Sequence, residues 1–214
     1  MAERLPVDPA APDPSALARA VAVLRTGELV VYPTETLYGI GADPFSEQAL
    51  LRVQQAKRRA DPKPVLLITA GLHEAEPFIA SVPPAAALLA DAFWPGPLTL
   101  LFAARNTVSR HLTQGTGRIG VRVPSSLLCR RLAALFGAPI TSTSANRTGE
   151  PTPSDVAGIE RVLAPAISLY LDAGALPPSK PSTIVDLTET PCRLTREGTI
   201  SAAQIRSIIP DATT

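Results

Sequence analysis

The chain has 214 residues, of which 45% are hydrophobic and 18% are charged, and its formal net charge is +1. This length and apolar content exclude a disordered chain and fit one domain with a sizeable core. The near-neutral charge excludes a global positive field that would attract nucleic acid, so any basic patch has to be local.

The cysteines and the apolar runs indicate the compartment. Cys129 and Cys192 are the two cysteines and have no CxxC spacing, which favours buried free thiols in a reducing cytosol. No uninterrupted apolar run approaches the roughly 18 residues that a membrane span needs, and the proline-rich start lacks the basic region of a signal peptide. We therefore expect a cytoplasmic protein without membrane segments.

The N-terminal third is expected to contain a tail, two helices and a strand. Residues 1–12 are rich in proline and alanine without periodicity, which predicts a flexible tail before a single domain over 13–214. Asp13 and Pro14 are typical of a helix start. A strand over 28–32 then leads into a glycine-containing turn, and Ser46 caps a second helix that ends in Lys57-Arg58-Arg59.

Helices and strands continue to alternate along the rest of the chain. Strands are predicted at 183–187 and at 192–196, and the connection between them is too short for a crossover helix. We therefore expect an α/β fold with a mixed parallel and antiparallel sheet flanked by helices. The other expected strands are 64–69, 98–103, 118–124, 138–141 and 167–172, and the other helices are 72–80, 83–93, 125–136, 154–164 and a last one that Ser201 and Gln204 begin as a capping box.

Several common catalytic motifs are missing. The sequence has no complete GxGxxG, no GxxxxGK[ST], no GxSxG and no HExxH, and its two histidines, His73 and His111, have unremarkable neighbours. Nothing in the sequence therefore predicts a metal site, a catalytic triad or a standard dinucleotide or P-loop site.

Polar segments instead lie at the ends of several apolar strands, which is where open α/β sheets place ligands. Any single hydroxyl there is more often a cap or turn residue, and a solvated helix end accounts equally well for residues 57–59. Together, however, their positive charges suit a phosphate ligand. The segments are Thr34 to Thr36, Arg118 with Arg122, Ser142 to Asn146, Ser182-Thr183 and Arg196, joined by Lys57, Arg59 and Lys63.

A set of motifs in fixed order resembles the threonylcarbamoyl-AMP synthase family (YrdC/TsaC) in its short, single-domain form. They are VVYPTETLYGIG at 30–41, Lys57-x-Arg59 with Lys63-Pro64, WPGPLT at 94–99, GVRVP at 120–124, SANRTG at 144–149, PSTIVD at 181–186 and REG at 196–198.

The resemblance implies a twisted, YrdC-like mixed sheet with a deep basic cavity. It also implies a nucleotidyltransferase that makes threonylcarbamoyl-AMP and pyrophosphate from L-threonine, bicarbonate or CO2, and ATP. This is the first step of the t6A modification of adenosine 37 in tRNA, so a downstream threonylcarbamoyl-transferase complex is an implied partner. Mg2+ is expected to be carried by the ATP phosphates, with few or no protein ligands.

The family's site residues transfer by matching position. Threonine would be held by Thr34, Arg122, Ser142 and Ser182. ATP would be held by Lys57, Arg59, Arg118, Ser144, Asn146, Thr152 and Arg196, with Lys57 and Arg59 as the catalytic cations. The exact roles of Glu35, Thr36 and Tyr38 stay open, and shaping the turn that holds Thr34 is one of the alternatives.

Two alternatives stay open at this point. The basic concavity could be a binding module for tRNA or double-stranded RNA without catalysis, although the near-neutral charge and the few aromatic residues count against it. A relative with the same fold could also transfer a carbamoyl group to another substrate. An assay that compares amino acids by pyrophosphate release separates these possibilities.

Overall fold

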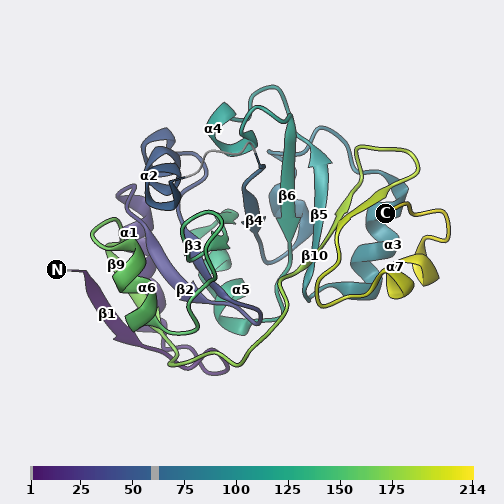
Figure 1. Cartoon of the computed structure of the whole chain (residues 1–214). Helices are drawn as coiled ribbons and strands as arrows, with labels where there is room; N and C mark the ends of the chain where they lie inside the picture. Colours follow the sequence, from purple (N-terminus) through teal and green to yellow (C-terminus); the bar gives the residue numbers. More distant parts are fainter. Residues whose placement is uncertain (1, 59–62) are drawn as a thin grey trace.

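The computed structural model describes residues 2–58 and 63–214, which form two β-sheets flanked by helices (Figure 1). The first sheet has strand order β1-β9-β2-β3-β8 and the second β11-β10-β5-β6-β4-β7. Pairing is mixed in both sheets, since β2 runs parallel to β9 and antiparallel to β3, and β5 runs parallel to β10 and antiparallel to β6. The predicted mixed α/β architecture is confirmed, with its strands divided between two sheets.

The strands of the first sheet are β1 (Glu3–Pro6), β2 (Val30–Pro33), β3 (Tyr38–Gly41), β8 (Thr143–Ser144) and β9 (Leu169–Asp172). Those of the second are β4 (Leu66–Ile68), β5 (Leu98–Ala103), β6 (Arg118–Arg122), β7 (Ile140–Thr141), β10 (Thr183–Asp186) and β11 (Arg193–Arg196). The helices are α1 (Pro14–Arg25), α2 (Glu47–Lys57), the 3-10 turn η1 (Leu72–Ala75), α3 (Pro84–Phe93), α4 (Arg110–Thr113), α5 (Leu127–Phe136), α6 (Val156–Leu163) and α7 (Ala202–Ile208).

The predicted helix starts are confirmed by their caps. The Asp13 carboxylate accepts the backbone N–H of Ser15 at 2.8 Å at the start of α1, and the Ser46 hydroxyl accepts from Ala49 at 3.2 Å at the start of α2. Ser201 forms the expected capping box at the start of α7. Within the described part of the chain, no helix is long and apolar enough to span a membrane.

The expectation that residues 1–12 form a flexible tail is wrong for Glu3–Pro6. These residues form β1, which pairs in parallel with β9 from Glu3 opposite Leu169 to Pro6 opposite Asp172. The Arg4 guanidinium Nε also donates to the Asp172 carboxylate at 2.7 Å. The partner strand lies more than a hundred residues away in sequence, so local periodicity carries no signal for this pairing.

Residues 38–41, expected as a turn, also form a strand. The actual turn is short, because the Thr34 backbone N–H donates to the Leu37 carbonyl at 3.1 Å and β3 pairs with β2 from there. Gly41 lets the strands pack against the Tyr32 ring, since a Cβ at Gly41 would lie 2.7 Å from Tyr32 Cε1. The glycines thus serve close packing inside a sheet.

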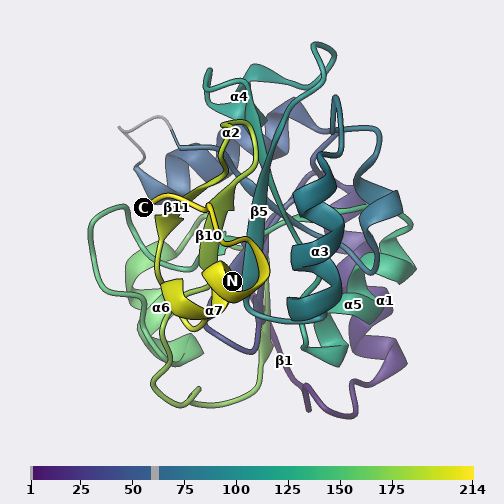
Figure 2. The same cartoon turned by 90° about the vertical axis from the view of Figure 1, so that its right-hand side faces the viewer.

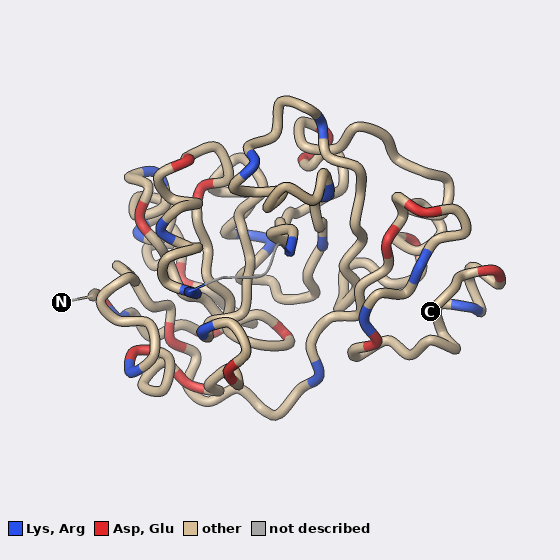
Figure 3. Tube along the Cα trace, turned by 45° about the horizontal axis from the view of Figure 1, so that its top comes forward, with Lys and Arg blue, Asp and Glu red and all other residues tan. Residues whose placement is uncertain are grey.

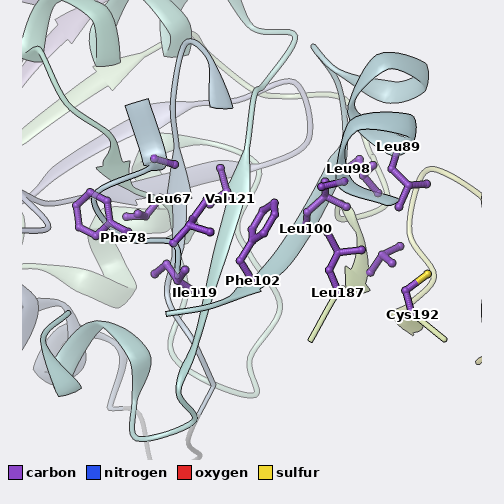
Figure 4. Close-up of a cluster of buried hydrophobic side chains, with 14 of the residues drawn as sticks. Leu67, Phe78, Leu89, Leu98, Leu100, Phe102, Ile119, Val121, Leu187 and Cys192 are labelled. Atoms are coloured by element: carbon purple, nitrogen blue, oxygen red, sulfur yellow. The ribbon is translucent and has the colours of Figure 1, made fainter. Parts of the chain in front are cut away.

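The helices bury apolar side chains on both faces of the first sheet and on one face of the second. Leu17 and Val21 of α1 pack with Leu128 and Leu132 of α5 on one face of the first sheet. The residues of α2 and α6 cover its other face. On the second sheet, side chains such as Phe102 and Val121 pack toward η1, α3 and α7 (Figures 2 and 4).

Both cysteines are free and buried, as predicted. Burial raises the pKa of the Cys129 thiol to about 12. Its sulfur lies 3.3 Å from the Pro33 carbonyl oxygen. Cys129 is therefore an inert core residue at neutral pH.

Candidate functional site

A cavity of about 920 Å3 is lined by residues from both sheets. The first sheet contributes the turn after β2 and the polar segment that begins at Ser142, and the second contributes β4, β5, β6, β10 and β11. A volume of this size is in the range of small-molecule sites. The cavity is therefore the candidate functional site.

Strand alternation explains how the second sheet reaches the cavity. Leu100 and Val121 pack in the core on the outer face, whereas Leu101 and Arg122, their sequence neighbours, line the cavity. Successive side chains of a strand point to opposite faces, so one face of this sheet packs in the core and the other lines the cavity. Thr99 of β5 belongs to the cavity face.

Nine of the eleven residues predicted for the site line this cavity. They are Thr34, Lys57, Arg122, Ser142, Ser144, Asn146, Thr152, Ser182 and Arg196. The fold thus brings these nine residues from distant positions in the sequence to one cavity. Their individual ligand contacts stay predictions.

The other two predicted residues, Arg118 and Arg59, are not among the described lining residues. Arg118 is outside the set of described residues that line the cavity, and its Nη1 lies 3.0 Å from the buried carboxylate of Asp186, with Glu189 at 3.3 Å from Nη2. Its ATP contact stays a prediction. Arg59 lies outside the described residues.

Lys57, the last residue of α2, holds the Ser144 to Asn146 segment. Its ammonium donates to the Asn146 carbonyl at 3.0 Å and to the Asn146 side-chain oxygen at 3.2 Å, and it also donates to the Ser144 carbonyl. The backbone N–H of Thr148 donates in turn to the Lys57 carbonyl at 2.9 Å. Lys57 and the Ser144 to Asn146 segment are thus hydrogen-bonded into one wall of the cavity.

Thr34 organises the turn at the end of β2. Its hydroxyl donates to the Leu37 carbonyl at 2.7 Å and accepts the backbone N–H groups of Thr36 and Leu37 at 3.1 Å each. It also lies 3.0 Å from the Thr36 hydroxyl. Both threonine side chains are buried at the cavity wall, so the turn is held in one conformation by its own side chains.

Arg122 is a buried cation held on three sides. Its Nε donates to the Gly96 carbonyl at 3.1 Å and its Nη1 donates to the Thr36 hydroxyl at 3.3 Å. Its Nη2 lies 2.7 Å from a carboxylate oxygen of Glu35. With 4% of its surface exposed, this guanidinium has a fixed position at the cavity wall.

Arg196 of β11 approaches the same cavity over Ser182. It donates from Nε to the Ser182 carbonyl at 2.9 Å and from Nη2 to the Ser182 hydroxyl at 3.0 Å. The Ser182 hydroxyl lies 2.9 Å from that of Thr99. Burial, reinforced by the positive charge of Arg122, lowers the pKa of Arg196. Two like charges facing one cavity are stabilised by an anionic ligand.

The basic character of the site is local. Lys57, Lys63, Arg122 and Arg196 are lining residues, against the single carboxylate of Glu150 among the described ones. Elsewhere basic and acidic positions are interspersed along the trace, in keeping with a net charge of +1 (Figure 3). The described residues include no group of three or more His, Cys, Asp or Glu side chains placed to hold a metal ion.

Sequence reasoning missed some of the lining hydroxyls. Thr99 is a polar residue inside the apolar strand LTLLFA, and this interruption is a usable signal for a residue on the ligand face. Sequence reasoning leaves the roles of Thr36 and Glu35 open, and the structure shows that both contact Arg122. That contact joins segments 86 positions apart, which no local pattern reveals.

A family model for Sua5/YciO/YrdC proteins, described as telomere recombination, matches residues 22–198. The chain belongs to the Sua5/YciO/YrdC family. Relatives include a putative threonylcarbamoyl-AMP synthase of Mycobacterium leprae, 38% identical over 94% of this chain and 92% of that protein. The threonylcarbamoyl-AMP synthase of Pyrococcus abyssi is 35% identical over 89% of this chain and 56% of its own length.

Solved structures of the Sua5/YciO/YrdC family superpose well on this chain. P. abyssi Sua5 complexed with L-threonine matches with a TM-score of 0.91 and 31% identity, over 100% of this chain and 62% of that one. E. coli YciO matches with a TM-score of 0.85 and 27% identity, over 96% of this chain and 99% of that one. The chain therefore spans less than two thirds of the P. abyssi protein and nearly all of YciO.

Proposed function

We propose that this chain is an L-threonylcarbamoyladenylate synthase, a nucleotidyltransferase that forms threonylcarbamoyl-AMP and pyrophosphate from L-threonine, bicarbonate or CO2, and ATP. The observation that carries the proposal is the arrangement of two fixed arginines, Arg122 and Arg196, around one cavity whose other wall is the Lys57 and Ser144 to Asn146 unit. Relatives that carry the synthase name, and a family structure complexed with L-threonine, support it.

The proposed reaction needs positioning and charge stabilisation more than a protein nucleophile. The threonine amine and CO2 form a carbamate, a carbamate oxygen attacks the α-phosphorus of ATP, and pyrophosphate leaves with the bonding electrons. Arg122 would hold the threonine carboxylate through paired N–H donors. Lys57, Arg59 and Arg196 would stabilise the phosphates, with Arg118, Ser144, Asn146 and Thr152 as further nucleotide contacts.

The threonine end of the cavity would be completed by hydroxyls. Thr34, Ser142 and Ser182 line the same cavity as Arg122 and would contact the amino acid. The donor set suits Mg2+ that arrives on ATP, because the described lining residues offer hydroxyls and the single carboxylate of Glu150. When bound, the ion would neutralise phosphate charge.

The experiment is mass-spectrometric detection of threonylcarbamoyl-AMP after incubation with ATP, threonine and bicarbonate, together with pyrophosphate release. Omitting any one substrate should abolish the product, and serine or alanine in place of threonine should give less of it. Absence of the adduct from a folded preparation would overturn the proposal. Pyrophosphate release with another amino acid instead would indicate a different carbamoyl acceptor.

The pathway partners are part of the same proposal. The activated threonylcarbamoyl group would pass to a transferase complex that modifies adenosine 37 of tRNA. Binding of tRNA or double-stranded RNA by this chain is a separate expectation, which a titration over a salt series tests, since contacts with the phosphate backbone weaken steeply as salt rises.

A further inference from the structure

Glu35 contacts Arg122 without belonging to the cavity wall. Its carboxylate oxygen lies 2.7 Å from Arg122 Nη2 and accepts the backbone N–H of Ser125 at 2.8 Å. Thr34 and Thr36 on either side of it line the cavity, whereas Glu35 is outside the described lining residues. The carboxylate therefore reaches the arginine from behind, on the side away from a ligand.

Glu35 is a negative charge at neutral pH. Its burial alone would raise the pKa, but the adjacent Arg122 guanidinium and the Ser125 N–H outweigh burial, and the pKa of Glu35 is lowered from its ordinary value. The pair formed with Arg122 is close to neutral as a unit. A guanidinium has five N–H donors, so the three protein oxygens around Arg122 leave donors for a ligand.

Arg196 has a different electrostatic environment in the same cavity. Its hydrogen-bond acceptors are the carbonyl and the hydroxyl of Ser182, both uncharged. Among the described residues, Arg196 forms no ion pair, whereas Arg122 forms one with Glu35. The cavity thus holds one arginine whose charge is balanced and one whose charge is not.

We propose that Glu35 is a positioning residue that also balances the charge of Arg122, so that this arginine accepts a single carboxylate and rejects a polyphosphate. This inference rests on the proposed function and adds how two anionic substrates are sorted within one basic cavity. A carboxylate needs two aimed donors and carries one charge. A polyphosphate carries several charges and is held by cations whose charge is not already compensated.

Glu35→Gln tests the idea because it keeps the shape of the side chain and removes its charge. Calorimetric titration with inorganic pyrophosphate should give about one binding site in the wild type and a second in Glu35→Gln. In kinetics, pyrophosphate should compete with ATP alone in the wild type and also with threonine in the variant, raising the threonine KM about tenfold.

Two controls separate charge from structure. Glu35→Asp keeps the charge and should restore wild-type stoichiometry. Glu28→Gln removes a carboxylate from another arginine, Arg52, which is outside the described lining residues, and should leave pyrophosphate binding unchanged. A structural role alone would leave the number of pyrophosphate sites unaltered in all three variants.

An unchanged stoichiometry and competition pattern in folded Glu35→Gln overturns the inference. If that variant does not fold, competition by inorganic triphosphate against threonine in the wild type overturns it instead. A wild type that makes no threonylcarbamoyl-AMP refutes the proposed function, while the calorimetric comparison still tests the charge balance.

Discussion

The Lys57 ammonium donates to the Asn146 carbonyl at 3.0 Å, across 89 positions of sequence, and both residues are buried. Lys57 is the last residue of α2, and its ammonium holds the Ser144 to Asn146 segment by hydrogen bonds. A cation in this position can stabilise the segment and a phosphate ligand at once. Its removal should therefore affect both stability and activity.

Lys57→Ala should lower adenylate formation about 100-fold or more, because a preorganised cation at the phosphates is lost. It should also lower the free energy of unfolding by about 1–3 kcal/mol, since buried oxygens of Ser144 and Asn146 lose their donor. Pyrophosphate release and thermal unfolding measure the two effects. Arg25→Ala, at the exposed end of α1, is the matched control and should change neither. Full activity in Lys57→Ala would refute the site assignment.

Arg122→Ala should raise the threonine KM about 30-fold or more, because truncating one member of a hydrogen-bonded charge pair with the ligand costs at least 2 kcal/mol. The KM for ATP should change much less. Initial-rate kinetics with each substrate varied in turn measure the two KM values. An unchanged threonine dependence would place the carboxylate elsewhere in the cavity.

Gly198→Ala should destabilise the fold by about 1–3 kcal/mol and displace Ser182, because there is no room for a side chain. A Cβ at Gly198 would lie 2.1 Å from the Pro181 carbonyl oxygen and 2.6 Å from the Ser182 carbonyl carbon. These are backbone atoms, which cannot rotate away. Chemical denaturation and threonine binding measure the two effects, and a variant with wild-type values in both would contradict the packing seen here.

Acidification should remove the stabilisation that Glu35 contributes. Its folded-state pKa lies below the ordinary value of 4.5, so the ion pair with Arg122 contributes fully above pH 4.5 and is lost as the pH falls through the folded pKa. The Tm difference between wild type and Glu35→Gln should be largest near neutral pH and shrink in acid. A difference that does not depend on pH would contradict the pair's contribution.

Local sequence signals predicted the helix caps and many of the polar residues of the cavity wall. Ser46 and Ser201 act through neighbours within a few residues. Thr34 and Ser142 follow the strands β2 and β7, and Ser182 immediately precedes β10, so strand ends that meet explain the positions of all three. The arrangement of strands in two sheets was not predictable in this way, because pairing depends on partners far along the chain.

The position of the Arg118 side chain is an example of what local sequence signals do not predict. It lies four residues before Arg122 on β6, so strand alternation predicts the same face for both. The side chain contacts Asp186, a fully buried carboxylate at the end of β10 that follows the cavity-lining Ile184 by two residues. Arg118 therefore keeps the predicted face of the sheet but lies outside the described lining of the cavity. A buried carboxylate requires a partner, and the sequence contains no sign that Asp186 would lie within reach of Arg118.

The pairing of β1 with β9 has a practical consequence for work with the protein. Deleting the first six residues would leave the edge of β9 with unpaired backbone groups, and an open strand edge invites association with other chains. Shortened versions should therefore aggregate more readily than the full sequence. An affinity tag fused before Glu3 is best joined through a flexible linker that leaves this strand free to pair.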